Sequence, residues 1–325
     1  MDRDLHDWLD TSADARLLRA WRRSGALTPA LADVPAPAAG QWRALLDRLA
    51  LWLGTALCAA ALICFIAANW EHLGKMVRLY GLQAVLLATT LGALWLGLRR
   101  AGGLALLWLS MLVLGGLLAL IGQTYQTGAD PWELFALWTA LALPWAIAAR
   151  HPAHWLSWAV IANVAWALWL DQTPWRRLDD DMAPVLMGLL NLTLLAAWEL
   201  AGRRWPEFGG RIGRWLLALA AMLPLSLFAI FDQMHADGPR WYGVPVWAAA
   251  TLVLGAYALR LRRDLAVLAM LALGIIGVVS TALHESLLKP LGDTAGLLLI
   301  AIAVVAQATA AGFLLRRLGR EETGA

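Results

Sequence analysis

Residues 101–138, AGGLALLWLSMLVLGGLLALIGQTYQTGADPWELFALW, decide the fold of this chain. One uncharged apolar run covers 101–129, and the next begins at residue 134. A helix needs about 20 apolar residues to cross roughly 30 Å of hydrocarbon. The first run is therefore long enough for one transmembrane helix followed by a polar segment, but too short for two transmembrane helices. This polar segment contains Gln123, Tyr125, Gln126, Asp130 and Glu133. We interpret the stretch as two transmembrane helices joined at a membrane surface.

The composition extends this interpretation to the whole chain. Its 325 residues are 61% hydrophobic and 15% charged, and the mean hydropathy is +0.63. Soluble domains are about 45–50% apolar and about 25% charged. Uncharged runs recur at 49–70, 79–98, 101–129, 134–149, 151–170, 182–198, 215–231, 241–259, 265–284 and 294–315. The sequence therefore predicts an all-α, polytopic transmembrane bundle of about ten helices within the lipid bilayer.

The basic residues indicate the orientation. They flank the apolar runs instead of forming one patch, so we expect no nucleic-acid partner despite a net charge of +3. Arg and Lys favour cytoplasmic connections. With the N-terminus inside, the cytoplasmic connections and tail carry most of the Arg residues that follow residue 48, whereas the outer connections carry Lys75, Arg78, Arg176, Arg177, Arg240 and Lys289. We predict that both termini are cytoplasmic.

The chain divides into four predicted parts. Residues 1–47 form a cytosolic amphipathic helical segment, with Leu5, Trp8 and Leu9 at helical spacing. Residues 48–171 and 172–315 form two membrane halves of five helices each, and 316–325 form a cytosolic tail. Cys58 and Cys64 belong to no metal-binding or disulfide pattern, and no motif predicts a cofactor.

A second polar cluster, AANWEH at residues 67–72, closes the first apolar run. The predicted topology places this cluster at the same outer membrane surface as the polar segment that contains Gln123 and Glu133. The candidate surface for a ligand or partner comprises Asn69, Trp70, Glu71, Gln123, Tyr125, Gln126, Asp130 and Glu133. Helix-end packing and capping, a ligand or partner surface, and catalysis all remain open for these residues.

Three outer connections pair a histidine with a carboxylate, as in a metal site or a pH-sensitive cluster. The residues are His72 beside Glu71, Asp232 near His235, and His284 beside Glu285. Connections on one face often lie well apart, and no dense ligand spacing such as HExxH occurs. Unrelated surface residues are the competing interpretation.

Polar residues inside the runs predict contacts between helices. Asn163 and Asn191 lie in mid-run and favour interhelical hydrogen bonds over a transport path. Glu199 precedes Arg203 by one helical turn, which predicts an ion pair. The pair His151 and His154 follows Arg150 and is expected to meet lipid headgroups. Tryptophans near both sets of helix ends suggest an aromatic belt at each interface.

The pairing of Ala67-Ala68-Asn69-Trp70 with Gln-x-Tyr-x-x-Gly at 123–128, followed by a Trp-rich helix, resembles a bacterial family catalogued as domain of unknown function 2157. The segment Trp21-Arg22-Arg23-Ser24-Gly25-Ala26-Leu27-Thr28 is similar to the short N-terminal segment of that family. The resemblance covers roughly residues 15–170. It implies a multi-pass protein of the bacterial inner membrane and supplies no reaction.

Three functional hypotheses follow. The first is a non-enzymatic membrane component whose outer polar surface docks a membrane or periplasmic protein partner or a lipid-linked envelope molecule. The alternative is a small-molecule or lipid transporter, for which related halves and a polar cavity near the midplane are expected. The third is a membrane enzyme that uses the outer carboxylates and histidines.

Overall fold

A computed structural model describes residues 38–68, 73–126, 128–172, 182–234, 242–288 and 293–323. Within these ranges every regular element is helical, which confirms the predicted all-α class. Three short 3₁₀ or π segments, η2 (Pro206–Phe208), η3 (Ala258–Arg262) and η4 (His284–Leu288), adjoin the long helices. The ten α-helices are α4 (Ala38–Ala68), α5 (Lys75–Leu96), α6 (Ala101–Tyr125), α7 (Pro131–Ala149), α8 (Pro152–Gln172), α9 (Met182–Ala201), α10 (Arg211–Gln233), α11 (Gly243–Tyr257), α12 (Leu265–Leu283) and α13 (Asp293–Thr323).

Each helix coincides with one of the ten apolar runs. In the described ranges, nine helices are long and apolar enough to cross a membrane, and α4 contains a shorter apolar segment, Leu49–Phe65. Two helices extend far beyond their runs. The first, α4, begins at Ala38, directly after Val34-Pro35-Ala36-Pro37, and α13 continues through the tail as far as Thr323. Helical hydrogen bonds do not require an apolar environment, so polar residues continue both helices.

The chain forms two compact units, Met1–Gly54 and Thr55–Ala325, and the division falls inside α4. The described part of the first unit is the beginning of α4. The second unit holds the end of α4 and the other helices of the described ranges.

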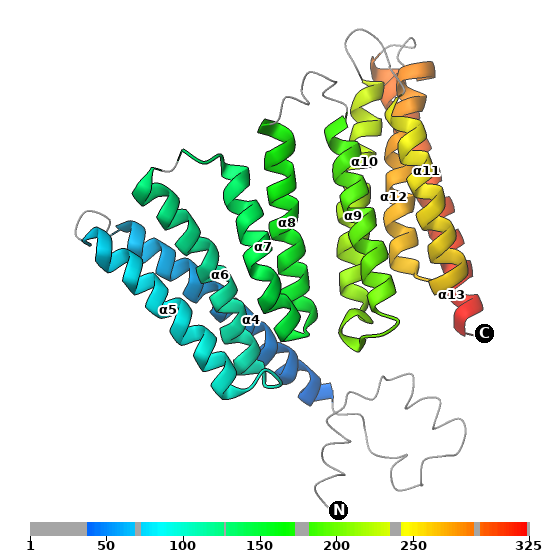
Figure 1. Ribbon diagram of the computed structural model, residues 1–325. Coiled ribbons are helices and arrows are strands. Elements are labelled where there is room, and N and C mark those ends of the chain that lie inside the picture. The colour runs from blue at the N-terminus through cyan, green and yellow to red at the C-terminus, as the bar shows by residue number, and fades with distance from the viewer. Residues whose placement is uncertain are drawn as a thin grey trace, which may run out of the picture. The chain divides into compact units, whose positions relative to one another are not determined.

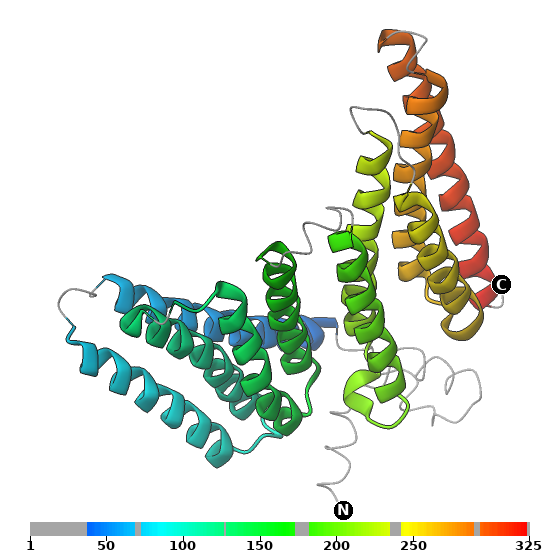
Figure 2. The ribbon, with the colours of Figure 1, turned by 45° about the horizontal axis from the view of Figure 1, so that its top comes forward.

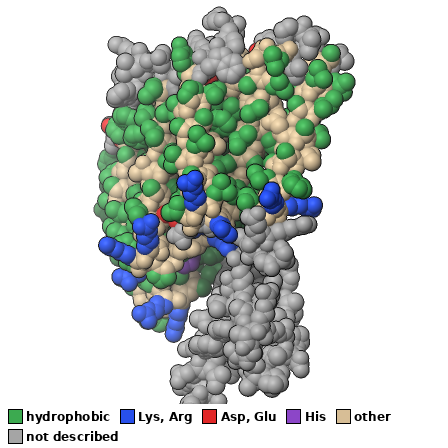
Figure 3. Space-filling model, turned by 90° about the vertical axis from the view of Figure 1, so that its right-hand side faces the viewer, with side chains coloured by type: hydrophobic (Ala, Val, Ile, Leu, Met, Phe, Trp, Pro, Cys, Tyr) green, Lys and Arg blue, Asp and Glu red, His purple; other side chains and the backbone are tan. Residues whose placement is uncertain are grey.

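Consecutive helices of the second unit run antiparallel, so their connections alternate between two ends (Figures 1 and 2). The connections α5–α6, α7–α8, α9–α10 and α11–α12 and the end of α13 lie at one end, which we call the basic end. Lys and Arg side chains gather towards it beside a broad hydrophobic surface (Figure 3). The other ends of these helices lie at the opposite end. The spatial separation of basic residues thus follows the predicted alternation.

The apolar side chains are distributed as expected for a protein surrounded by lipid. Large hydrophobic residues are exposed on the outside of the helices, among them Trp95, Leu273 and Phe313, which are 87%, 72% and 73% exposed. Such a surface would be unstable in water, because patches of this extent drive association. The main buried cluster joins α8–α12, and three smaller clusters join the helices before α9.

Candidate functional site

The predicted surface at the α6–α7 connection is present and accessible. Gln123 and Tyr125 belong to the last turn of α6, and Gln126 ends that helix in the left-handed conformation with φ of 45°. Asp130 is the N-cap residue of α7, and Glu133 lies in its first turn. All five side chains are exposed. The Asp130 carboxylate makes no capping hydrogen bond to α7, so helix capping does not explain it.

A cation–π contact relates this surface to the start of α5. The Lys75 Nζ lies 4.0 Å from the centre of the Tyr125 ring. The first residue of α5 and the last of α6 are therefore neighbours at the opposite end. Asn69, Trp70, Glu71 and His72 lie outside the described residues, so only the α6–α7 part of the predicted surface lies in the described residues.

The proposed metal ligands have varied surroundings. Asp232 is only 3% exposed, and its Oδ2 accepts a hydrogen bond of 2.8 Å from the Gly243 amide, which joins α10 to α11. His284 and Glu285 belong to η4 and are half-buried. His72 and His235 lie outside the described residues. Over the part of the chain that is described, no three His, Cys, Asp or Glu side chains are grouped to hold a metal ion.

Asn163 and Asn191 form a reciprocal amide pair between α8 and α9, which confirms the predicted interhelical contact. Each Nδ2 donates to the Oδ1 of the other residue, at 3.1 Å and 2.6 Å. Each Nδ2 also donates to a carbonyl one turn earlier in its own helix, that of Ala159 or Met187. The amides are thus engaged with protein groups, which is a structural role.

A buried ionic network at the basic end was missed by sequence reasoning. Arg214, in the first turn of α10, binds Glu199 of α9 and contacts Asp264 Oδ2 at 2.8 Å. Trp215 donates its indole N–H to the same Asp264 carboxylate. Helical spacing had suggested Arg203 as the partner of Glu199. The observed partners are 15 and 50 residues from Arg214, a separation that no local pattern reveals.

Asp264 also begins α12, because its Oδ1 accepts from the amides of Ala266 and Val267. Burial opposes ionisation of this carboxyl. The hydrogen bonds from Arg214, Trp215 and Val267 outweigh burial and lower the pKa of Asp264 below its ordinary value. The network therefore joins three helices around a charged carboxylate.

Tryptophans have a second use that the aromatic-belt prediction missed. Several indole N–H groups join neighbouring helices through hydroxyl or carbonyl oxygens. The bonds are Trp108 to Ser157, Trp138 to the Met111 carbonyl, Trp145 to Ser110, Trp158 to the Thr139 carbonyl and Trp247 to Ser226, at 2.7–3.1 Å. Helix-face periodicity in an apolar run cannot identify which indole meets an acceptor.

The expectation that both His151 and His154 meet headgroups is wrong for His154. Its side chain is fully buried, at 0% exposure, while the His151 ring packs edge-on against it with centroids 6.0 Å apart. His151 precedes α8 and His154 lies in the first turn of that helix, so the two side chains have different surroundings.

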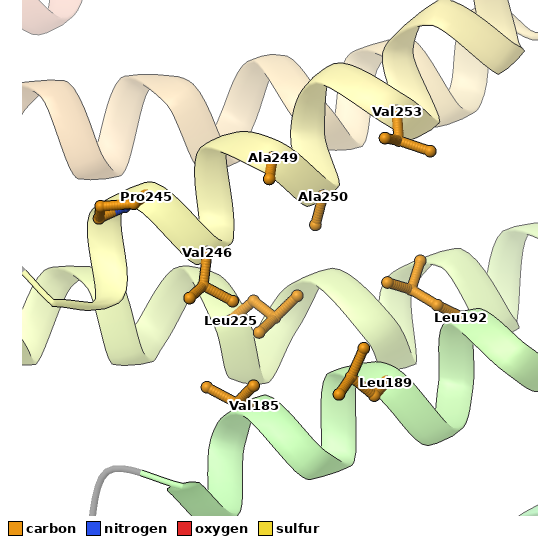
Figure 4. Close-up of a pocket in the computed structure, with 9 residues that line it drawn as sticks. All are labelled: Val185, Leu189, Leu192, Leu225, Pro245, Val246, Ala249, Ala250 and Val253. Atoms are coloured by element: carbon orange, nitrogen blue, oxygen red, sulfur yellow. The ribbon is translucent and has the colours of Figure 1, made fainter.

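Two cavities lie between helices of the described part of the chain. One, of about 500 Å³, lies among α9, α10 and α11, and its wall is formed entirely by apolar residues such as Val185, Leu225 and Val253 (Figure 4). The other, of about 440 Å³, is bordered by α7, α8, α9, η2 and α10 at the basic end. Its lining combines Trp155, Trp158, Trp198, Trp205 and Phe208 with Arg150 and Glu207.

Comparison with known families relates the first half of the chain to other proteins. Residues 19–155 match the family model described as predicted membrane protein (DUF2157). The matched segment includes the α6–α7 surface and ends within α8, so it excludes the ionic network and most of the second cavity. No curated protein and no solved structure matches the chain. Together with the apolar helices, the match identifies an integral membrane protein, and the description of the matched family names no activity.

Proposed function

We propose that the protein is a non-enzymatic membrane component that docks a partner protein through its outer polar surface. The observation that supports the proposal best is the state of Asp130 and Glu133. Both carboxylates are exposed, and neither makes an ion pair in the described residues. They stand beside exposed Gln123, Tyr125 and Gln126. Tyrosine is enriched at protein interfaces, and the rim around the centre of an interface is polar.

The local backbone supports presentation of these groups to a partner. The left-handed residue Gln126 ends α6, and Pro131 begins α7, so both helix ends are well defined around the connection. The Lys75–Tyr125 contact holds the phenol ring against α5. A surface held in place before binding loses less conformational entropy when it binds.

The distribution of basic residues supports an outward orientation for this surface. Arg side chains are concentrated at the basic end, which we assign to the cytoplasm by the positive-inside preference. The α6–α7 surface would then face the periplasm of a bacterial inner membrane, and both termini would be cytoplasmic. A lipid-linked envelope molecule is the other ligand compatible with that location.

Topology reporters test the orientation directly. A periplasm-active enzyme fused after Ala129 should be active, and the same enzyme fused after Arg262 should be inactive. A cytoplasm-active reporter at the two positions should give the reverse pattern. Activity of the periplasmic reporter at Arg262 would overturn the assignment.

Transport is the second candidate, favoured by the cavity at the basic end. The Asn163–Asn191 pair argues against a polar path at that level, because the amides are hydrogen-bonded to each other. Mass spectrometry of the protein purified from its native membrane would detect a retained small molecule as well as a partner protein. A retained solute without a partner protein would favour transport over docking.

The docking proposal is tested with the full chain purified from its native membrane in a mild detergent. Mass spectrometry should find one partner protein at near-stoichiometric amount with the unaltered protein. The double variant Tyr125→Ala, Asp130→Asn should lose it. The matched control is Tyr242→Ala, Asp171→Asn, which alters an exposed tyrosine and an exposed aspartate at the same end. Equal recovery from both double variants, or no partner with the unaltered protein, would refute docking.

A further inference from the structure

The cavity at the basic end has the depth of a lipid headgroup and the adjoining part of its chain. Arg150, Trp155 and Ala201 border it where α7 ends, α8 begins and α9 ends. Leu194 borders it about 10 Å deeper along α9, given a rise of 1.5 Å per residue. Its volume of about 440 Å³ is within the usual range for small-molecule sites. The cavity therefore runs from the membrane boundary into the hydrocarbon layer.

Aromatic rings line the cavity near the boundary. Phe208 of η2 is the central ring, with its centroid 5.4 Å from that of Trp155, 4.9 Å from Trp198 and 6.3 Å from Trp205. Grouped indole faces attract organic cations such as ammonium groups. The indole N–H of Trp198 is buried and has no hydrogen-bond partner in the described part of the chain, which leaves a donor beside the cavity.

Two opposite charges border the same cavity without neutralising each other. Arg150 and Glu207 both contribute to the lining, yet neither makes an ion pair within the described residues. The nearby Glu199 and Asp264, in contrast, both form ion pairs with Arg214. An anion at Arg150 and a cation at Glu207 would complete the electrostatics of the cavity.

From these features we propose that the cavity binds one zwitterionic phospholipid. The phosphate contacts Arg150, the ammonium group contacts Glu207 and the aromatic rings around Phe208, and one acyl chain extends towards Leu194. An anionic lipid without an ammonium group would satisfy Arg150 but leave Glu207 without a cation. The entirely apolar cavity among α9, α10 and α11 offers no such headgroup recognition. The inference is independent of the docking function proposed above.

The test is native mass spectrometry of the full chain in detergent, with phosphatidylethanolamine or phosphatidylglycerol of the same acyl chains added at equal concentration. We expect one phosphatidylethanolamine to bind severalfold better than phosphatidylglycerol. Glu207→Gln should abolish the preference, and Arg150→Gln should weaken binding of both lipids. Ala197→Leu, which fills the cavity, should remove the bound lipid.

Matched controls separate this site from general lipid contact. Arg203→Gln removes an exposed charge at the same end, and Ala249→Leu fills the other cavity, so both should bind as the unaltered protein does. Equal binding of the two lipids, or equal loss in the control variants, would overturn the proposal. Glu207→Gln preserves size and shape, so it decides the question even where Ala197→Leu fails to fold. Tyr125→Ala, Asp130→Asn should retain the lipid whatever becomes of its partner protein.

Discussion

Helices α5–α8 and helices α9–α13 are held together by different polar contacts. The first group uses neutral bonds, in which the indoles of Trp108, Trp138, Trp145 and Trp158 donate to hydroxyl or carbonyl oxygens of adjacent helices. The second group has one such bond, from Trp247 to Ser226, and adds the charged network of Glu199, Arg214 and Asp264. It also holds most of the largest apolar cluster.

The difference predicts how each group responds to damage. Interhelical hydrogen bonds in membranes contribute on average about 0.6 kcal/mol each, so a group that relies on several neutral bonds loses little with any one of them. Removing one partner of a buried ion pair is costly, because an uncompensated charge remains. Stability should therefore depend on many residues in α5–α8 and on few in α9–α13.

Arg214→Leu should have the largest effect. The substitution leaves Glu199 and Asp264 buried without their cation, and loss of a buried partner typically costs about 3–5 kcal/mol. The free energy of unfolding, measured by denaturant titration in mixed micelles, should fall by roughly this amount. The control is Arg211→Gln, which alters an exposed arginine in the same helical turn. Equal loss in both variants would contradict a special role for the network.

Gly115→Ala should have the next largest effect and acts within the first group. An added Cβ would lie 2.3 Å from Cζ2 of Trp138, whose indole is fixed by its bond to the Met111 carbonyl. Overpacking of this kind typically costs about 1–3 kcal/mol. The adjacent Gly116→Ala is the control, because its Cβ would meet only side chains at 3.9 Å. The same titration should give a lower free energy of unfolding for Gly115→Ala than for Gly116→Ala. Equal values would show that α7 can shift to accommodate the added methyl group at little cost.

The corresponding substitution in the second group refines this comparison. At Gly188 an added Cβ would lie 2.6 Å from Cγ of Leu225, a side chain that can change rotamer. Gly188→Ala should therefore cost less than Gly115→Ala, where a hydrogen-bonded ring must move. The reverse order would mean that the large apolar cluster is the more rigid of the two regions.

The fold followed from the sequence because lipid imposes a simple rule. Each spanning helix must satisfy its own backbone hydrogen bonds and present apolar side chains over a nearly constant length. The runs around residues 101–129 and 134–149 therefore predicted α6 and α7. The start of α4 at Ala38 was missed, because hydropathy marks the hydrocarbon layer and not the polar turns that continue a helix beyond it.

The candidate site was only partly predictable. Gln123–Glu133 stood out because polar residues interrupt an apolar sequence there, and the structure places them together on the surface. Arg214 did not stand out, because an arginine beside a helix start ordinarily indicates a headgroup contact. Its partners come from separate helices, so their convergence depends on helix rotation and packing. Glu207 was overlooked in the same way, since η2 places it at the cavity.

Replacing single indole donors should produce smaller losses. Trp145→Phe removes the bond to Ser110 in the first group, and Trp247→Phe removes the bond to Ser226 in the second. Each should lower the free energy of unfolding by about 0.6 kcal/mol beyond the effect of lost volume. The two losses should add in the double variant, because distant sites behave independently. Ser110→Ala in a double-mutant cycle with Trp145→Phe isolates the hydrogen bond, and a coupling energy of zero would refute its contribution.

The smallest effect expected is a pH dependence specific to α9–α13. Because folding lowers the pKa of Asp264 below its ordinary value of 3.8, its ionised form stabilises the folded protein above that pH. This contribution should disappear as the pH falls through the lower folded value, so the midpoint temperature should drop in acid. Asp264→Asn should lack that component, whereas Gly115→Ala should retain it.

Arg214→Leu provides the sharper form of this test. Without the guanidinium, burial becomes the main influence on the Asp264 carboxyl and raises its pKa, so protonation should now stabilise the folded state. The stability of the variant should therefore rise as the pH falls from neutral to about pH 4, whereas the Asp264 contribution to the unaltered protein is constant over that range and is lost only below 3.8. A parallel dependence in the two proteins would show that Arg214 does not control this carboxyl. A rise confined to the variant would establish that the second half of the bundle depends on charge where the first depends on neutral hydrogen bonds.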